Sequence, residues 1–446
     1  MKFIETLKNI WKIEDLRSKI LVTLLFILIY RFGSFIVLPG IDPSALTALK
    51  SQTAGGLMSL LDMFSGGAFS NASIFALGIM PYISASIVVQ LLTIAVPYFQ
   101  KMQHDGESGR RKMNQITRYL TVVVLILQGW AYLKNLDYQL RGAGAIMETG
   151  FWFMLSSMII MCAGSMFVMW LGERMTDKGI GNGISMLIMI GIIARLPEAT
   201  VQEFISRAGA SQGGLVMFLA ELVVLILVVA ASILLVQGQR KIPVQYAKRV
   251  VGNKQYGGVR QYIPLRVNAA GVMPIIFAQA IMMLPIMFAG FNADGVNNFM
   301  RVFMDNTGFW YNFVYALMII AFTYFYTAIT VNPTMMAEEL KRNNAFIPGI
   351  KPGKKTAEYL DEIMSRITLP GSVFLALVAI MPAFASIFGI TMGFAQFYGG
   401  TSLLILVGVV LDTTQQISAQ LQMHHYDGLM ASGGRFNGRY GSVAAY

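Results

Sequence analysis

The stretch Ser73–Leu92 constrains the fold most, because it is uncharged and apolar over the ~20 residues that cross a bilayer. Its middle reads Gly78-Ile79-Met80-Pro81-Tyr82-Ile83, and a similar run, Gly271-Val272-Met273-Pro274-Ile275-Ile276, returns with a shift of 193 residues (271 − 78). Two Gly/Pro-interrupted apolar helices at matching places predict a membrane protein built from repeats, with its working site between them. Because Gly and Pro are common in membrane helices, chance similarity is the alternative.

Composition places the whole chain in the same class. Of its 446 residues, 55% are hydrophobic and 13% are charged, whereas about a quarter are charged in soluble domains. The single cysteine, Cys162, can form no disulfide within the chain. Residues 1–19 include three acidic residues and no apolar core, so we expect an amphipathic cytoplasmic segment on the membrane surface rather than a cleaved signal.

Apolar segments of spanning length recur along the whole chain. We therefore predict an all-α polytopic membrane protein with ten transmembrane helices. The predicted spans are Ile20–Leu38, Ser73–Val96, Tyr119–Leu133, Phe151–Leu171, Ile180–Ala194, Gly214–Val236, Val267–Gly290, Phe309–Val331, Leu369–Phe388 and Gly399–Leu421.

Lys and Arg are distributed very unevenly between the two sides of these spans. The N-terminal tail, the even-numbered connections and the C-terminal tail hold 27 of them, and the odd-numbered connections hold 6. This bias predicts that both termini are cytoplasmic. Five spans per half then give inverted, pseudo-symmetric halves at residues 20–195 and 196–422, followed by a cytoplasmic tail at 423–446.

Two cytoplasmic connections, residues 237–266 and 332–368, are long and basic. The first alternates basic residues with tyrosines, and Gly257-Gly258 suits a hairpin turn within it. Length and aromatic content favour a docking surface for a protein or RNA, and positive-inside charge alone is the alternative. The candidate docking residues are Lys248, Arg249, Lys254, Lys351, Lys354 and Lys355.

The outward segment at residues 60–71 is too short to span and contains the pair Gly66-Gly67. It leads directly into the interrupted second span. Two readings stay open: a short helix that re-enters the channel mouth, covered there by protein, or an ordinary surface helix.

The spans contain no constellation of catalytic residues. The three histidines, His104, His424 and His425, lie near span ends or in the tail, and Lys178–Gly183 lacks the ending of a phosphate-binding loop. We therefore predict no enzyme, no cofactor and no metal site. The polar residues at mid-depth are neutral, which favours a conduit for varied cargo closed by an apolar constriction. A secondary transporter for a small solute is the alternative, since it shares inverted repeats but normally buries ionisable groups.

Long motifs recur from the first span to the last: Asp62–Asn71 (DMFSGGAFSN), Ser73–Ser86 (SIFALGIMPYISAS), Gly106–Lys112 (GESGRRK), Met169–Glu173 (MWLGE), Gly179–Ser185 (GIGNGIS), Gln245–Arg249 (QYAKR), Asn332-Pro333, Ala345–Ile350 (AFIPGI) and Gly399–Leu404 (GGTSLL). In this order they resemble the SecY family, the channel subunits of bacterial protein translocases. Lys351 departs from the Arg usual there, and Asn253-Lys254 offers one basic residue where many relatives have two.

The resemblance implies a pore closed by a ring of apolar residues, a plug beneath it and a lateral gate between the second and seventh spans. Carried over motif by motif, the ring falls on Ile79, Ile83, Ile184, Ile188, Ile276 and Ile405. The plug falls on Asp62, Met63, Phe64, Ser65, Gly66, Gly67 and Ala68. The gate falls on Pro81, Ser84, Ile87, Gln90, Pro274, Ala278 and Gln279.

The resemblance also implies what the chain acts on and with. We expect a protein-conducting channel in the bacterial cytoplasmic membrane, which translocates unfolded secretory polypeptides and releases membrane spans sideways into the lipid. The implied partners are SecE-like and SecG-like small membrane subunits, a SecA-like motor ATPase, and the ribosome through its RNA. Membrane lipids and the unfolded polypeptides themselves complete the set.

Overall fold

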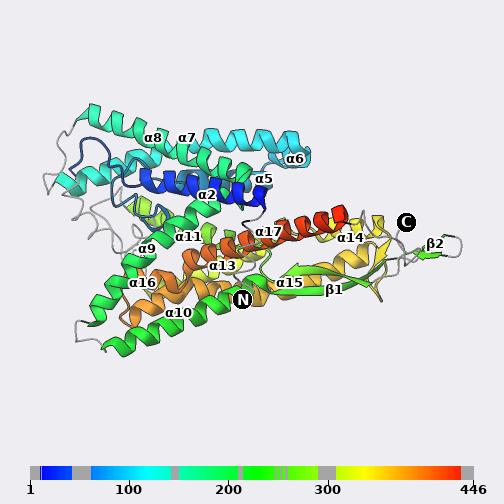
Figure 1. Cartoon of the computed structure of the whole chain (residues 1–446). Coiled ribbons are helices and arrows are strands. Elements are labelled where there is room, and N and C mark those ends of the chain that lie inside the picture. The colour runs from blue at the N-terminus through cyan, green and yellow to red at the C-terminus, as the bar shows by residue number, and fades with distance from the viewer. Residues whose placement is uncertain are drawn as a thin grey trace.

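The computed structural model describes residues 11, 13–42, 62–141, 150–208, 214–246, 249–251, 254–256, 260–289 and 308–432. Helices α2, α5, α6, α7 and α8 of the first half lie in the upper part of Figure 1, and α9 descends from them to the second-half helices below. The first half contains α2 (Glu14–Gly33), α5 (Met80–Ala95), α6 (Pro97–His104), α7 (Gly106–Arg141), α8 (Phe151–Lys178) and α9 (Gly183–Ala208).

The second half adds a small β region to its helices. Its helices are α10 (Gly214–Gln237), α11 (Met273–Ala289), α13 (Phe309–Thr330), α14 (Pro333–Arg342), α15 (Lys354–Ile387), α16 (Met392–Ala395), η2 (Gln396–Tyr398) and α17 (Gly400–Ser432). Its strands are β1 (Gln239–Tyr246), β2 (Arg249–Val251), β3 (Lys254–Tyr256), β4 (Arg260–Arg266) and β5 (Ala345–Phe346).

Each of the ten predicted spans falls on a helix of the described part of the chain, and seven of these helices are long and apolar enough to cross a membrane. The protein is therefore a mostly helical, polytopic membrane protein. Two helices begin well before the predicted spans, α7 at Gly106 and α15 at Lys354. Ion pairs one turn apart, such as Arg111–Glu107 at 2.7 Å, support these polar extensions.

The repeated Gly-x-Met-Pro runs have the same local structure in both halves. Gly78 and Gly271 have φ angles of +53° and +64°, and the helices begin two residues later, at Met80 and Met273. The prolines therefore occupy the first turn, where a missing N–H costs nothing and the fixed φ suits a helix. The expectation that these prolines interrupt a helix and let it bend is wrong, since they start one.

The chain before α5 is not helical, although it lies within the predicted second span. After helical residues 62–64, residues 65–79 form a series of turns, nearly all of them buried. Their backbone groups bond locally and to the end of α2, as in Leu38 N–H to Ala72 O (2.9 Å) and Ile74 N–H to Ile36 O (3.0 Å). The described part of the predicted re-entrant helix is therefore mostly turns, and this irregular backbone is tolerated because protein covers it.

Buried charges fasten the place where the halves join, between α9 and α10. The Arg207 guanidinium pairs with Glu203 at 3.0 Å and with Glu221 of α10 at 2.6 Å, and all three side chains are less than 5% exposed. Glu203 also accepts a hydrogen bond from Thr391 N–H at 2.8 Å. Removing one member of such a cluster would leave the other charges unpaired in a low dielectric, which is costly. The cluster therefore stabilises the join between the two halves.

Candidate channel and gate

The largest described cavity, about 860 Å³, opens between the two halves. Helices α5, α9, α11 and α17 all contribute to its wall, so both halves enclose it. Five of the six predicted ring residues line it: Ile83, Ile184, Ile188, Ile276 and Ile405. Side chains from opposite halves, far apart in sequence, are thus brought to one space.

Polar residues line the other parts of this cavity. They include Asn182, Arg266 and Asp412, together with Gln237 and Gln415. The neutral residues Ser86, Gln90 and Ser185 also line the cavity, whereas Gln279, Thr401 and Ser402 line a separate pocket. We call this cavity the vestibule, and the part lined by isoleucines its floor.

Apolar packing continues beyond that floor. Ile79, which does not line the cavity, is 4% exposed and belongs to one buried apolar cluster with Ile188 and Ile405. Met63 and Phe64 belong to the same cluster. Water that enters the vestibule therefore meets a continuous apolar layer that offers it no hydrogen bonds.

The predicted plug segment, residues 62–71, is largely buried, and its polar contacts come from helices of the first half. All of the predicted plug residues, Asp62 to Ala68, are buried. Tyr30 of α2 donates a hydrogen bond to Ser65 O (3.3 Å), and Tyr132 of α7 donates one to Phe69 O (2.8 Å). A Cβ atom at Gly191 of α9 would lie 2.8 Å from Phe64 O, so the two backbones are in direct contact.

The predicted gate residues divide into two groups. Ile87 and Gln90 of α5 line the vestibule, opposite Met273 and Ile276 of α11. Ala278, in contrast, is fully buried in the core of the second half. The remaining gate residues do not line the vestibule: Pro81 and Pro274 are buried at the helix starts, Ser84 is half-buried, and Gln279 lines the outer pocket.

A second pocket of about 380 Å³ lies on the outer side of α5 and α11. Gln90 borders both this pocket and the vestibule, and the far wall carries Phe277 of α11 stacked on Phe322 of α13. Among the described residues, none donates a hydrogen bond to the buried Gln90 Oε1. Leaving such an atom unpaired costs roughly 1–3 kcal/mol, so this amide is an unfavourable element of the wall between the two cavities.

The two long basic connections form one structural unit. Strand β1 pairs with β4 on one side and with β5 of the other connection on the other, through Gln245–Phe346 and Tyr246–Ala345. The unit projects from one end of the molecule beside α14 (Figure 1). It has an apolar core of its own: Ile242, Val244, Leu265, Leu340, Ala345, Ile347, Leu360 and Met364.

The candidate docking residues lie on this unit. Lys351, Lys354 and Lys355 are exposed. Arg249 and Lys254 lie on strands β2 and β3, which form a hairpin, and Lys248 lies outside the described residues. Val251 pairs with Lys254 at one end of this hairpin, and the expected turn at Gly257-Gly258 lies outside the described residues.

Sequence reasoning missed two charged residues that the site uses. Asp412 lines the vestibule, although the sequence showed only an acid near the end of a span. Arg195 contacts the plug segment through Ser70 Oγ, at 3.0 Å from its Nη2. The only sequence signal for Arg195 was its place directly after an apolar span. Counting Lys and Arg residues by side of the membrane treats such an arginine as exposed, which is why its contact was missed.

The fold and the site define a helical membrane protein with a large cavity between two halves and a buried apolar cluster beside it. The SecY family pattern matches residues 73–414. Protein translocase subunit SecY of Streptomyces scabiei is 43% identical over 432 residues, which cover 94% of this chain and 98% of the relative. The chain belongs to the SecY family, and it is a protein-conducting translocation channel and not an enzyme.

Solved structures share this fold at low sequence identity. One, from a study in which the plug domain of SecY stabilises the closed channel and maintains a membrane seal, has a TM-score of 0.62 and 16% identity. It covers 90% of this chain and 92% of its own. The channel of a canine ribosome–channel complex from the endoplasmic reticulum has a TM-score of 0.56 and 17% identity, with 90% and 92% covered. The similarity of these structures extends over both halves.

Proposed function

We propose that this channel passes unfolded secretory polypeptides through the isoleucine ring and releases apolar segments sideways between α5 and α11. The observation that carries the proposal is the vestibule floor, where isoleucines from α5, α9, α11 and α17 meet. Flexible apolar side chains on separate helices can part around a chain of any sequence and close again behind it. A small-solute transporter needs specific polar groups at that place instead.

Three further features support this proposal. The plug segment lies against the same apolar cluster as the ring, and the related structure described above assigns a seal to the plug domain. The unpaired amide of Gln90 and the apolar pocket beyond it favour lateral opening towards lipid. The Lys/Arg bias predicts that the β unit and both termini lie on the cytoplasmic side of the bacterial cytoplasmic membrane.

The proposed partners follow from the exposed surfaces. The β unit, with Lys351, Lys354 and Lys355, presents positive charge suited to ribosomal RNA or to an acidic face of a motor ATPase. One related structure is a ribosome–channel complex. The apolar outer faces of α2 and α10 suit small membrane subunits and lipid, since residues such as Leu28 and Ile226 are about two-thirds exposed.

The ring is tested by making it polar. Replacing Ile83 and Ile276 together by Asn gives water two hydrogen-bonding partners at the constriction, and the idle channel should then leak ions in planar bilayers. We expect an increase in conductance of at least tenfold over the wild type. As a matched control, Leu227→Asn with Leu317→Asn alters two exposed membrane-facing positions, at 63% and 55% exposure, and should leave conductance unchanged. A double ring variant that stays as tight as the wild type would exclude these residues from the pore.

A further inference from the structure

The plug segment begins with a buried charge. The Asp62 side chain is 6% exposed, and its carboxylate forms an ion pair with the Arg195 guanidinium of α9. The same carboxylate accepts a hydrogen bond from Ser70 N–H at 2.8 Å. Asp62 therefore closes the plug segment on itself through Ser70, near the segment's other end, and ties the segment to α9 through Arg195.

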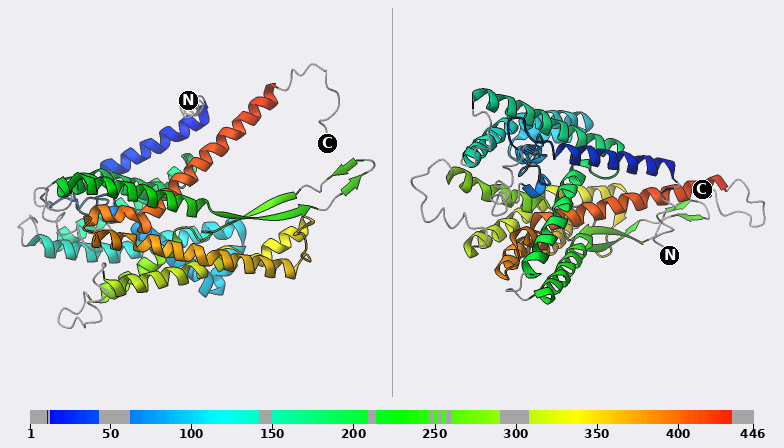
Figure 2. Two further views of the ribbon diagram at one scale, coloured as in Figure 1. Left: turned by 90° about the horizontal axis from the view of Figure 1, so that it is seen from below. Right: turned by 60° about the vertical axis from the view of Figure 1, so that its left-hand side comes forward.

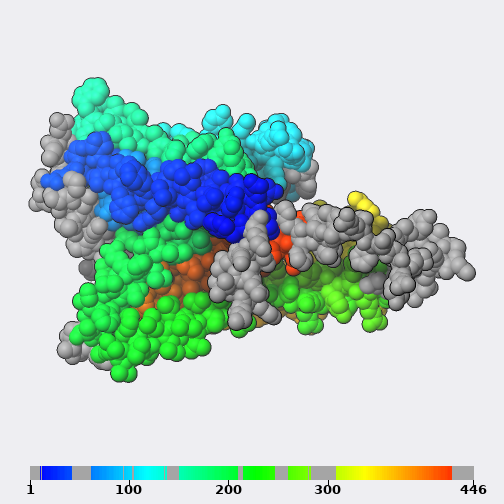
Figure 3. Space-filling view, viewed as in Figure 1, coloured from blue at the N-terminus to red at the C-terminus, as the bar shows by residue number. Residues whose placement is uncertain are grey.

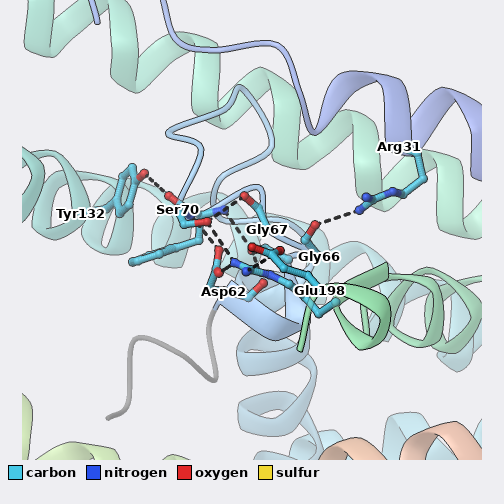
Figure 4. A network of polar contacts seen from close by, with 10 residues as sticks. Arg31, Asp62, Gly66, Gly67, Ser70, Tyr132 and Glu198 are labelled. Atoms are coloured by element: carbon cyan, nitrogen blue, oxygen red, sulfur yellow. Dashed lines mark hydrogen bonds and ion pairs between the residues drawn. The ribbon is translucent and has the colours of Figure 1, made fainter. Parts of the chain in front are cut away.

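Two arginines hold the segment from different helices. Besides pairing with Asp62, Arg195 donates a hydrogen bond to Ser70 Oγ at 3.0 Å. Arg31 of α2 donates one to Gly66 O at 2.8 Å. Figure 4 shows Arg31 reaching Gly66 from one side, with Tyr132 at the far side of the loop and Glu198 close to Asp62. The segment is thus held by groups on several sides rather than by a single contact.

Among the described residues, the polar anchors of the plug segment share one origin. Tyr30 and Arg31 belong to α2, Tyr132 to α7 and Arg195 to α9, so all come from the first half. Towards the second half, the segment shares only the apolar cluster, which includes Phe394, Tyr398 and Ile405. Apolar contacts are non-directional and separate without leaving an unpaired group, whereas the ion pair and hydrogen bonds hold position.

We propose that the Asp62–Arg195 ion pair is the latch that keeps the plug segment closed, and that it fastens the plug to the first half. This inference rests on the proposed sealing role of the segment. The halves part along the apolar contact, and the plug stays with α9 until the translocating chain displaces it. Water in the open pore then solvates both separated charges, which makes the release reversible, whereas neutralising one partner in the closed state strands the other. Asp62 and Arg195 are accordingly positioning residues for the seal.

Neutral variants of each partner test the latch. In the idle channel, Asp62→Asn and Arg195→Gln should each raise ion conductance by roughly tenfold or more. The double variant should leak no more than the worse single variant, because one interaction is removed in all three. Glu198→Gln is the matched control: it removes a 54% exposed carboxylate from the same guanidinium and should leave conductance at the wild-type level.

A second readout separates a latch from a merely structural role. Export of a precursor with an intact signal should persist in both latch variants, whereas a misfolded channel loses export and abundance together. A variant with residues 63–70 replaced by Gly and Ser tests the seal itself. If that variant leaks while Asp62→Asn and Arg195→Gln stay tight, the latch is refuted and the sealing role stands. If none of the three leaks, both the seal and its latch are refuted.

Discussion

At the scale of single residues, close backbone contact fixes the plug segment as firmly as its charges do. A Cβ atom at Gly191 would lie 2.8 Å from Phe64 O and 3.2 Å from Gly66 N, both backbone atoms that cannot rotate away. Gly191→Ala should therefore displace the plug segment and raise the idle ion conductance several-fold. Gly393→Ala is a matched control, since its new Cβ would meet nothing closer than 3.9 Å, and it should stay tight. Equal conductance in the two variants would show that the contact does not hold the plug.

Some site residues could be predicted from the sequence and others could not. The ring isoleucines could be placed from local motifs, because each motif carries its own register along a helix. Arg195 could not be recognised, because its partner Asp62 lies far away in sequence and on an irregular segment. Charge counting treats every arginine after a span as solvated, although this side chain is only 24% exposed.

At the scale of elements, the spans were predictable and the irregular segments were not. Apolar length locates helices in a membrane, so each predicted span fell on one. Hydropathy cannot separate residues 73–79 from α5, because buried turns are as apolar as a helix. The pairing of β5 with β1 could not be predicted either. The two strands belong to different connections, and no local pattern in either sequence indicates its partner.

The cytoplasmic β unit should depend on its small core. Leu360 is 1% exposed within that core, so Leu360→Ala removes buried methyl groups and should destabilise the unit by about 2–5 kcal/mol. Amide hydrogen exchange in β1 and β4 should then accelerate, while exchange in α8 and α9 stays unchanged. Tyr359→Ala is the matched control, because the neighbouring side chain is 37% exposed and its loss should leave exchange as it was. Unaltered exchange in the Leu360 variant would mean that the two connections are not held by this core.

At the scale of the whole molecule, two halves surround one vestibule and join through α9 and α10. Figure 2 shows the helices of the two halves side by side in two further views, with the β unit extending from one end. In the space-filling view, α17 is visible between the blue surface of α2 and the green surface of the second half (Figure 3). Buried charges fix the join, whereas the unpaired amide of Gln90 lies between the vestibule and the pocket beside α5 and α11. The proposed lateral opening lies on this side of the molecule.

A disulfide between α5 and α11 tests this opening directly. In a Cys162→Ser background, a cysteine at Ile87 is paired in turn with one at Met273 or Ile276, since all three positions line the vestibule, and we expect one pair to be trapped as a disulfide when the helices approach each other. The test positions on α11 are therefore near its first residues. Ala278, which the sequence assigned to the gate, is not used because it is buried in the second half. Oxidation should block both secretion and membrane insertion, and reduction should restore both. A cysteine at Val88, on the 41% exposed face of α5, is the matched control and should form no such bond. Full substrate flux through a tethered pair would rule out a gate between these helices.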